Sequence, residues 1–291
     1  MPPSQQPPNV RQRRVARALR RWRNNAGQKL DETGKQLGWS DSKLSRLETA
    51  AVHAGPAEII ALATVLGVDE AERDRTVRLA VSATQSRDEW GTYGPGSLRG
   101  DLKDFIEDES EAVEVRTVEM VLVTGLLQTD RYSEELLRAW EPDLDQKVLD
   151  ERRRLRRQRR ARLDDQADPL RLHAIMLETA LTLPIGGPLI MADQLDHLAT
   201  CSEKANITIQ VLPANLGAFP GFGTAYHLVY VEQDVAMAAY VDGLTDGAYI
   251  EEEDQVAAYT LNFERLRERA LSPDESARRI AEIKRAWKLK E

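Results

Sequence analysis

Residues 28–48 of the chain read QKLDETGKQLGWSDSKLSRLE, a pattern that predicts two short helices joined by a tight turn. Gly34 falls where the helices would cross, and a close crossing needs a side chain of methyl size or less. Gly38 falls at the turn, which needs a residue that tolerates a positive φ. Only Thr33 stands where another apolar residue would be expected. The predicted inward positions are Leu37, Trp39, Leu44 and Leu47.

The second of these helices has a polar outer face. Ser40 has the character of an N-cap, because its hydroxyl can accept from an open backbone N–H. Short polar side chains let a helix approach base edges, and basic ones reach guanine acceptors or phosphates. This is typical of a DNA-binding helix-turn-helix, and six constraints at fixed offsets favour it over an αα-hairpin with a solvated face. The residues left on the outer face are Asp41, Ser42, Lys43, Ser45 and Arg46, and together with Ser40 they are the DNA contacts predicted for this helix.

Charge is divided unevenly along the 291 residues. Residues 1–66 hold eleven lysines and arginines against five acids, a net charge of +6, while the remainder holds 29 against 43, a net charge of −14. A basic head on an acidic body directs the head toward a polyanion. Seven arginines lie within residues 11–23, and the apolar stripe there leaves them on the other helix faces. We expect Arg20 to be among those that contact the DNA backbone.

Residues 10–68 resemble the lambda-repressor-like, XRE-type DNA-binding domain, with a basic first helix VRQRRVARALRRWRNNAG, the two-helix motif, and GPAEIIALATVLGV as a further helix. The rest resembles the uncharacterised C-terminal domain of actinobacterial, WhiJ-like regulators. The resemblance implies a transcriptional regulator of development or antibiotic production in an actinomycete. It depends on the segments GLLQT, ETALTLPIGGP, MADQLDHL, ITIQVLP, GAFPGFG and FERLRERALSPDES.

Two departures from that family pattern bear on affinity. Lys29 and Leu30 replace the usual Thr-Gln pair, so Lys29 can still reach a phosphate while the buttressing role of the glutamine is lost. After Glu48, the usual Gly-Arg-Arg turn is replaced by residues 50–53, AAVH. Two phosphate contacts are thereby removed, which predicts modest affinity or reliance on partners.

The sequence predicts two domains. Residues 10–85 form an all-α helix-turn-helix domain, whose last helix begins with a capping box of Asp69 and Glu72. Residues 101–291 form an α+β (mixed α/β) regulatory and dimerisation domain. Residues 1–9 are expected to be a disordered tail and residues 86–100, with four glycines, a linker. Strands are expected near residues 118–123, 170–177, 207–212, 225–231 and 235–241.

No catalytic, cofactor or metal site is predicted. The four histidines are far apart in sequence, and Cys201 has no CxxC partner. The segments GAFPGFG and IGGP lack the lysine of a phosphate-binding loop and the GxGxxG pattern. We therefore expect a protein that is not an enzyme. A single cysteine and the lack of any apolar stretch of roughly 20 residues favour a cytoplasmic protein.

Two further segments allow alternative interpretations. The arginine-rich run at residues 152–162 is either a second nucleic-acid surface or a set of ion pairs within the chain or between subunits. The acids on both sides of the run favour pairing. In GAFPGFG, Phe219, Pro220 and Phe222 either complete the domain core or form a ligand or partner site. The core interpretation is favoured for both aromatic rings.

The sequence thus predicts a sequence-specific regulator that binds double-stranded DNA as a homodimer and represses by occlusion, under control of its C-terminal domain. An alternative is the DNA-binding half of an antitoxin-like pair, whose C-terminal domain binds a small partner protein encoded nearby. An enzyme is the third possibility, and no motif supports it.

Overall fold

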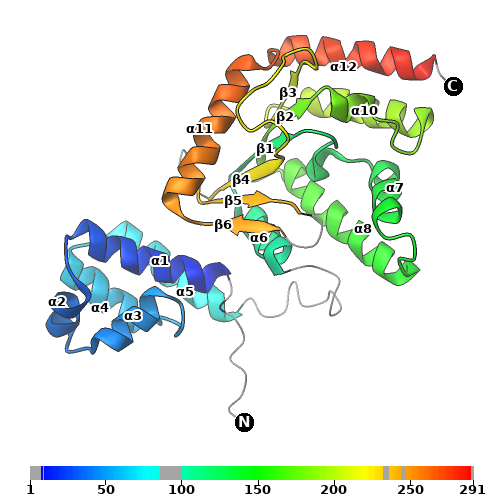
Figure 1. Ribbon diagram of the computed structural model, residues 1–291. Coiled ribbons are helices and arrows are strands. Elements are labelled where there is room, and N and C mark those ends of the chain that lie inside the picture. The colour runs from blue at the N-terminus through cyan, green and yellow to red at the C-terminus, as the bar shows by residue number, and fades with distance from the viewer. Residues whose placement is uncertain (1–7, 9, 86–99, 232–235, 244–246, 290–291) are drawn as a thin grey trace. The chain divides into compact units, whose positions relative to one another are not determined.

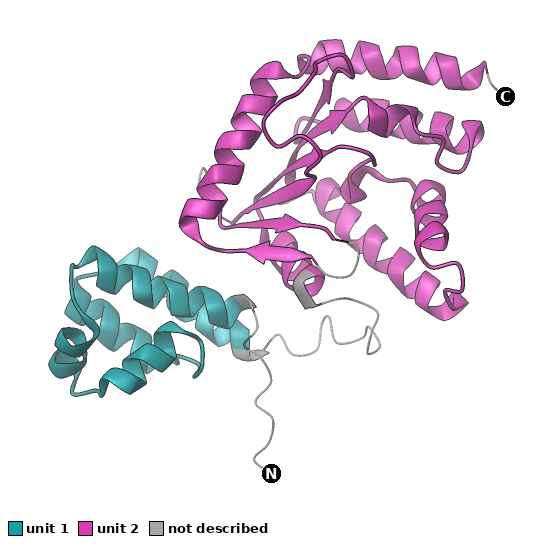
Figure 2. Ribbon diagram, viewed as in Figure 1, with its two compact units in different colours: residues 1–94 teal, residues 95–291 magenta. Residues whose placement is uncertain are grey.

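The computed structural model describes residue 8 and residues 10–85, 100–231, 236–243 and 247–289. The chain divides into two compact units, residues 1–94 and residues 95–291 (Figure 2). The first is helical, and the second combines one mixed sheet with helices, so the predicted fold classes are confirmed (Figure 1). The predicted tail, residues 1–9, and linker, residues 86–100, lie outside the described residues except for Pro8 and Gly100.

Helices of the first unit surround one apolar core. In the described part they are α1 (Val10–Asn25), α2 (Leu30–Leu37), α3 (Asp41–Glu48), α4 (Pro56–Leu66) and α5 (Glu70–Gln85). The predicted stripe of α1 supplies Val15, Leu19 and Trp22, which are buried against Leu44 and Leu47 of α3 and against α4 and α5. Burial of these side chains, rather than local propensity, stabilises such short helices.

The start of α5 corrects one prediction. Asp69 caps the helix as expected, because its Oδ1 accepts from the backbone N–H groups of Ala71 and Glu72. Glu72 turns to α1 instead of completing a capping box, since its Oε1 accepts from Arg21 at 2.8 Å and from the indole of Trp22 at 2.6 Å. Burial acts to raise the pKa of Glu72, but these two donors outweigh it and the pKa is lowered. The carboxylate therefore ties α5 to α1.

The second unit is built on a six-stranded sheet in the order β3-β2-β1-β4-β5-β6. Strands β1 (Glu114–Glu119), β2 (Arg171–Leu177) and β3 (Ile207–Leu212) are parallel, with Val118 opposite Ile175. Strands β4 (Tyr226–Tyr230), β5 (Ala238–Val241) and β6 (Ala248–Ile250) extend the sheet in antiparallel fashion. The parallel pairs need helical crossovers. These are η1 (Gly125–Leu127), α7 (Asp130–Trp140), α8 (Gln146–Ala161) and η2 (Arg162–Asp164) before β2, and α9 (Thr179–Thr182) and α10 (Pro188–Ser202) before β3.

Helices cover both faces of this sheet (Figure 1). On one face α11 (Glu253–Arg269) buries Phe263 and Leu266 against Val118, Ile175 and Leu228. On the other face α6 (Gly100–Glu111) stacks Phe105 on Tyr240, with ring centroids 4.8 Å apart. The last helix, α12 (Pro273–Lys288), packs on α10 and beside β3.

The first strand is not where the sequence placed it. The prediction was residues 118–123, whereas β1 ends at Glu119. Beyond the end of β1, the backbone of Val123 pairs with side chains instead of a strand: its N–H donates to the hydroxyl of Tyr132, and its carbonyl accepts from Gln128. The short edge strand β6 was not predicted. The other four expected strands coincide with β2, β3, β4 and β5.

Candidate nucleic-acid interface

The turn between α2 and α3 has the geometry that its glycines predicted. A methyl group on Gly34 would lie 2.9 Å from the carbonyl oxygen of Trp39 and 3.4 Å from a carboxylate oxygen of Asp41. The close approach is thus between α2 and the residues that enter α3. Gly38 ends α2 with a φ of 67°, and the Ser40 hydroxyl caps α3 by accepting from the Lys43 N–H at 3.2 Å. All three local predictions are confirmed.

Thr33 is buried although it is polar. Its hydroxyl donates to the side-chain oxygen of Gln28, in the connection between α1 and α2, at 2.8 Å. A buried hydroxyl with a partner is tolerated where an orphaned one would be costly. This bond explains the polar residue at an inward position.

The outer face of α3 centres on Ser42 and Arg46, which lie one turn apart and are both exposed. Arg46 folds back along its helix, since its Nε donates to the carbonyl of Ser42 at 3.1 Å. Ser45 is half-buried, and Asp41 is exposed at the first turn. Thr49 was not predicted as a site residue, yet it is exposed and its hydroxyl donates to the carbonyl of Ser45 at 2.8 Å. Its spacing from Ser42 and Ser45 was the signal for including it.

Lys43 is engaged within the unit. Its Nζ lies 4.2 Å from the centre of the Trp39 ring and 3.4 Å from a carboxylate oxygen of Glu58 on α4. The side chain is half-buried. To bind a phosphate, Lys43 would have to leave these two partners. Lys43 is therefore a predicted contact with a competing structural role.

A largely buried ion pair joins α3 to α1. The Arg23 guanidinium donates from Nε and Nη2 to the two carboxylate oxygens of Glu48, at 2.7 and 2.8 Å, and from Nη1 to the carbonyl of Gln28 at 2.9 Å. Only 11% of the Arg23 side chain and 4% of the Glu48 side chain are exposed. The hydrogen bonds that Arg23 donates to the Glu48 carboxylate raise the pKa of Arg23. This pair, termed the α1–α3 clamp, fixes the orientation of the outer face.

Two other predicted contacts lie on the surface. Arg20 is exposed on α1, and Lys29 is exposed at the position that precedes α2. The Lys29 side chain cannot accept a hydrogen bond, but its backbone N–H donates to the Glu32 carboxylate at 2.9 Å, which helps to cap α2. Both cationic side chains can therefore extend toward phosphates without breaking a described ion pair.

The turn after α3 has an unusual backbone. Ala50 has a φ of 57°, and within the described ranges it is the one residue other than glycine with a positive φ. The resemblance had placed a glycine-containing turn here, and the structure keeps the left-handed conformation with alanine. The Val52 N–H donates to the carbonyl of Arg46 at 3.1 Å, closing the end of the helix.

The GAFPGFG loop, residues 217–223, separates its two aromatic rings. Phe219 is 7% exposed and joins the core under α11, whereas Phe222 is 65% exposed and meets Phe219 edge-to-face at 5.1 Å. The core interpretation is confirmed for Phe219 and wrong for Phe222. Asn262 of α11 holds the loop, donating to the carbonyl of Pro220 and accepting from the hydroxyl of Tyr226, each at 2.8 Å.

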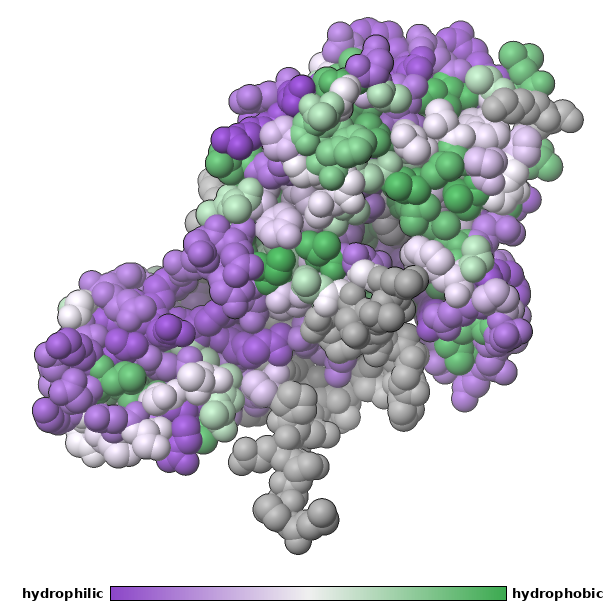
Figure 3. Space-filling view, viewed as in Figure 1, coloured by the Kyte–Doolittle hydropathy of each residue, from purple (hydrophilic) through white to green (hydrophobic). Residues whose placement is uncertain are grey.

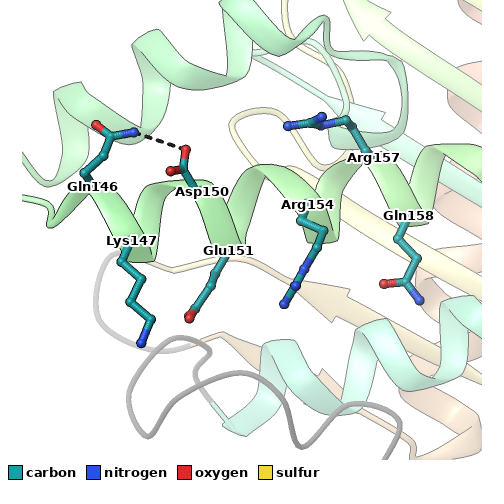
Figure 4. Close-up of a pocket in the computed structure, with 7 residues that line it drawn as sticks. All are labelled: Gln146, Lys147, Asp150, Glu151, Arg154, Arg157 and Gln158. Carbon is teal, nitrogen blue, oxygen red and sulfur yellow. Dashed lines mark hydrogen bonds between the residues drawn. The ribbon is translucent and has the colours of Figure 1, made fainter.

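The arginines of α8 form ion pairs within the second unit, as the sequence favoured. Arg159 donates twice to the buried carboxylate of Glu109, at 2.6 and 2.8 Å, while Arg153 and Arg160 bind Glu134 and Asp130 of α7. Figure 4 shows the outer side of α8, along which lies an open hollow of about 1140 Å³. A small-molecule site is usually lined by apolar side chains, whereas the described residues that line this hollow are polar or charged. Its lining residues are Gln146, Lys147, Asp150, Glu151, Arg154, Arg157 and Gln158.

Sequence reasoning missed a buried polar cluster on the sheet face opposite α11. Glu119 accepts from the hydroxyl of Thr117 at 3.2 Å, and a ring nitrogen of His227 lies 3.8 Å from the same carboxylate oxygen. Burial raises the pKa of Glu119 to about 8 and lowers the pKa of His227 to about 3. Both groups are thus mainly neutral near pH 7. Among the residues that the structure describes, no three His, Cys, Asp or Glu side chains gather as a metal site would require.

A two-helix motif with an exposed polar face, set in a small helical unit, defines a DNA-binding helix-turn-helix protein. Residues 14–76 match a helix-turn-helix domain family. Residues 102–282 match the domain of unknown function DUF5753, and because this match spans more than half of the chain, the protein belongs to the DUF5753 family. No curated protein and no solved structure gives a significant match. None of the described helices combines the length and apolar character needed to cross a membrane.

Proposed function

We propose that the protein is a sequence-specific transcriptional repressor that occludes its target sites, with dimerisation and signal input supplied by the second unit. The observation that carries this proposal is the outer face of α3. Ser42 and Ser45 are short enough to let the helix enter the major groove, and Arg46 can make a bidentate contact to the O6 and N7 acceptors of guanine. To do so, Arg46 exchanges its bond to the Ser42 carbonyl for the base edge.

The α1–α3 clamp links phosphate contacts made from α1 to the position of α3, the helix proposed to contact the bases. Arg20 on α1 and Lys29 before α2 would bind the backbone irrespective of sequence. Because Arg23 and Glu48 join α1 to α3 with little exposure, anchoring of α1 also fixes where α3 lies in the groove. The face of the first unit seen in Figure 3 is mainly hydrophilic. The net charge of +6 on residues 1–66 is in keeping with a polyanionic partner.

Two copies are needed for operator-grade affinity. A single small domain buries about 600–1,000 Å² on DNA, at the low end for specific complexes. Two copies reading half-sites one helical turn apart, or a multiple of it, double the contacts. The acidic second unit would be repelled by the DNA and left to hold the copies together.

The proposed protein acts in the cytoplasm and is located on the nucleoid when it is bound to DNA. The proposal also assigns it to a WhiJ-like group of actinobacterial regulators and gives it no enzymatic activity. The antitoxin-like alternative is a second unit occupied by a small partner protein. Exposed Phe222 is the observation that favours it, because an aromatic ring with 65% exposure is a typical contact residue. Co-purification from the native host separates the two: a stoichiometric small protein supports the alternative.

Chromatin immunoprecipitation with sequencing tests the function directly and identifies the sites. We expect enrichment of a short inverted repeat overlapping promoters, and a rise in transcription of the adjacent genes when the protein is removed. A purified chain that binds the enriched sites no better than shuffled DNA of equal length would overturn the proposal.

A further inference from the structure

The outer face of α11 carries a regular line of side chains directed away from the sheet. Val256, Phe263 and Leu266 face the core, whereas Ala258 is exposed and Leu261 is 53% exposed on the opposite side. Asp254, Ala258, Leu261 and Arg265 follow one another at steps of four, three and four residues. This is the spacing of a helix that packs along another helix, and these four residues are termed the α11 seam.

The two ends of the α11 seam carry opposite charges. Residues 251–254 are all acidic, while residues 264–269 contain three arginines and two glutamates. The carboxylate of Glu264 forms ion pairs with Arg116 at 2.9 Å and with Arg267 at 2.7 Å. Glu264 therefore does not neutralise the charge of Arg265. The helix thus presents an acidic start and a basic end to any partner.

The seam is complementary to a second copy of itself in antiparallel orientation. Its steps are symmetric about the midpoint between Ala258 and Leu261. In such a pair Asp254 of each copy faces Arg265 of the other, and the small Ala258 faces the larger Leu261. The same contacts form twice, as a two-fold interface requires. A parallel arrangement would instead place like charges together.

Phe222 stands beside this seam. Its neighbour Gly221 lies against the side chain of Asn262, which follows Leu261 directly, and a methyl group on Gly221 would lie 2.8 Å from the amide oxygen of Asn262. The bond from Asn262 to Pro220 fixes the loop to α11. An exposed aromatic side chain has few rotatable bonds, so it costs little entropy to immobilise, and this is the character of an interface hot spot.

We propose that the second unit forms a two-fold dimer through antiparallel packing of α11 on its counterpart, with Phe222 at the flank of the interface. This inference rests on the proposed function in one respect: the proposed function requires two copies of the chain to bind DNA together. The 17 residues of α11 span about 25 Å at 1.5 Å per residue, which accommodates the whole seam.

Multi-angle light scattering on the full chain tests the surface. We expect wild type at twice 32.8 kDa and Leu261→Asp at 32.8 kDa with an unchanged circular dichroism spectrum. Leu189→Asp is the matched control, because Leu189 on α10 is 58% exposed and lies outside the seam, so this variant should remain dimeric. A monomeric wild type, or a Leu261→Asp variant as dimeric as the control, would overturn the proposal.

Charge exchange tests the antiparallel register. Asp254→Arg and Arg265→Asp should each be monomeric, because each places like charges at both ends of the pair. An equal mixture of the two variants should form dimers, and the double variant should dimerise by itself. Single variants that dimerise as wild type does, together with a mixture that associates more tightly than wild type, would indicate parallel packing and refute the register.

Binding to a single half-site distinguishes this inference from the proposed function. If both hold, Leu261→Asp keeps half-site affinity and loses the tighter binding to the inverted repeat. If the chain dimerises through α11 but binds neither the half-site nor the inverted repeat, the proposed function is refuted and the proposed dimer interface is supported. If Leu261→Asp binds the inverted repeat as wild type does, the interface fails and DNA binding stands.

Discussion

Replacing Glu48 by alanine should destabilise the first unit strongly, because it leaves the guanidinium of Arg23 without its carboxylate in a site where only 11% of that side chain is exposed. Two charge-assisted hydrogen bonds, of 2.7 and 2.8 Å, are lost at once. The remaining bond from Arg23 to the carbonyl of Gln28 does not neutralise the charge.

The size of the effect follows from the burial of the pair. Removing one partner of a buried ion pair costs about 3–5 kcal/mol. A helical unit of about 75 residues has a free energy of unfolding of about 4–11 kcal/mol. Glu48→Ala should therefore remove between about a quarter and all of it. Replacing both Arg23 and Glu48 by methionine should cost much less than the sum of the single changes, because no charge is left buried.

Hydrogen exchange of the full chain, read by mass spectrometry, reports the two units separately. We expect α1 and α3 to lose about a hundredfold or more in protection in Glu48→Ala, since 1.4 kcal/mol corresponds to a factor of ten. Peptides from β1 to β3 should not change. Asp31→Ala, which breaks the exposed pair with Lys35, is the matched control and should leave α1 and α3 protected. Equal protection in Glu48→Ala and this control would refute the structural role of the clamp.

Three further predictions concern other sites. Arg46→Ala should weaken binding to the cognate site by about 1–3 kcal/mol and relax base preference, whereas Arg20→Ala should weaken binding to cognate and random DNA alike and flatten its salt dependence. Fluorescence anisotropy over a salt series measures both effects. Equal losses of affinity on cognate and random DNA for Arg46→Ala would contradict the assignment of Arg46 to base recognition. Phe219→Ala should lower the stability of the second unit by about 3–5 kcal/mol because the ring is buried. Phe222→Ala should melt at the same temperature as wild type and weaken self-association. Equal shifts of the melting curves of the two variants would be the contrary result. Because burial raises the pKa of Glu119 from 4.5 to about 8, its ionisation opposes folding, so the free energy of unfolding should fall by on the order of 4 kcal/mol as pH rises from about 4.5 to 8. Chemical denaturation at pH 5 and 8 should show this fall reduced in Glu119→Gln, and an unreduced fall would exclude Glu119 as its source.

Features set by near neighbours could be predicted from the sequence. Gly34, Gly38 and Ser40 satisfy steric and hydrogen-bonding requirements that arise within a few residues, and the structure bears out each. The clamp was not predictable, because seven arginines of α1 look alike in sequence and only the fold selects Arg23 as the partner of Glu48, 25 residues away.

The second unit shows where pattern reasoning fails. Residues 118–123 include an apolar run that resembles a strand, but β1 is the more polar segment EVRTVE. Its charged residues are accommodated by distant partners, since Arg116 binds Glu264 of α11. Phe219 and Phe222 lie three residues apart in one glycine-containing loop, and only the packing against α11 separates a core ring from an exposed one. The order of the strands depends on such long-range pairings.

The position of β4 in the sheet has a consequence for synthesis of the chain. One edge of β1 pairs with β4, which follows it by about 110 residues. At about 5–20 residues per second, that edge waits roughly 5–20 s on the ribosome before its partner exists. The first unit, made of local helical contacts, folds within milliseconds of emerging. A nascent chain therefore passes through a stage in which the DNA-binding unit is complete while one edge of β1 is unpaired, the stage most exposed to aggregation and to capture by chaperones.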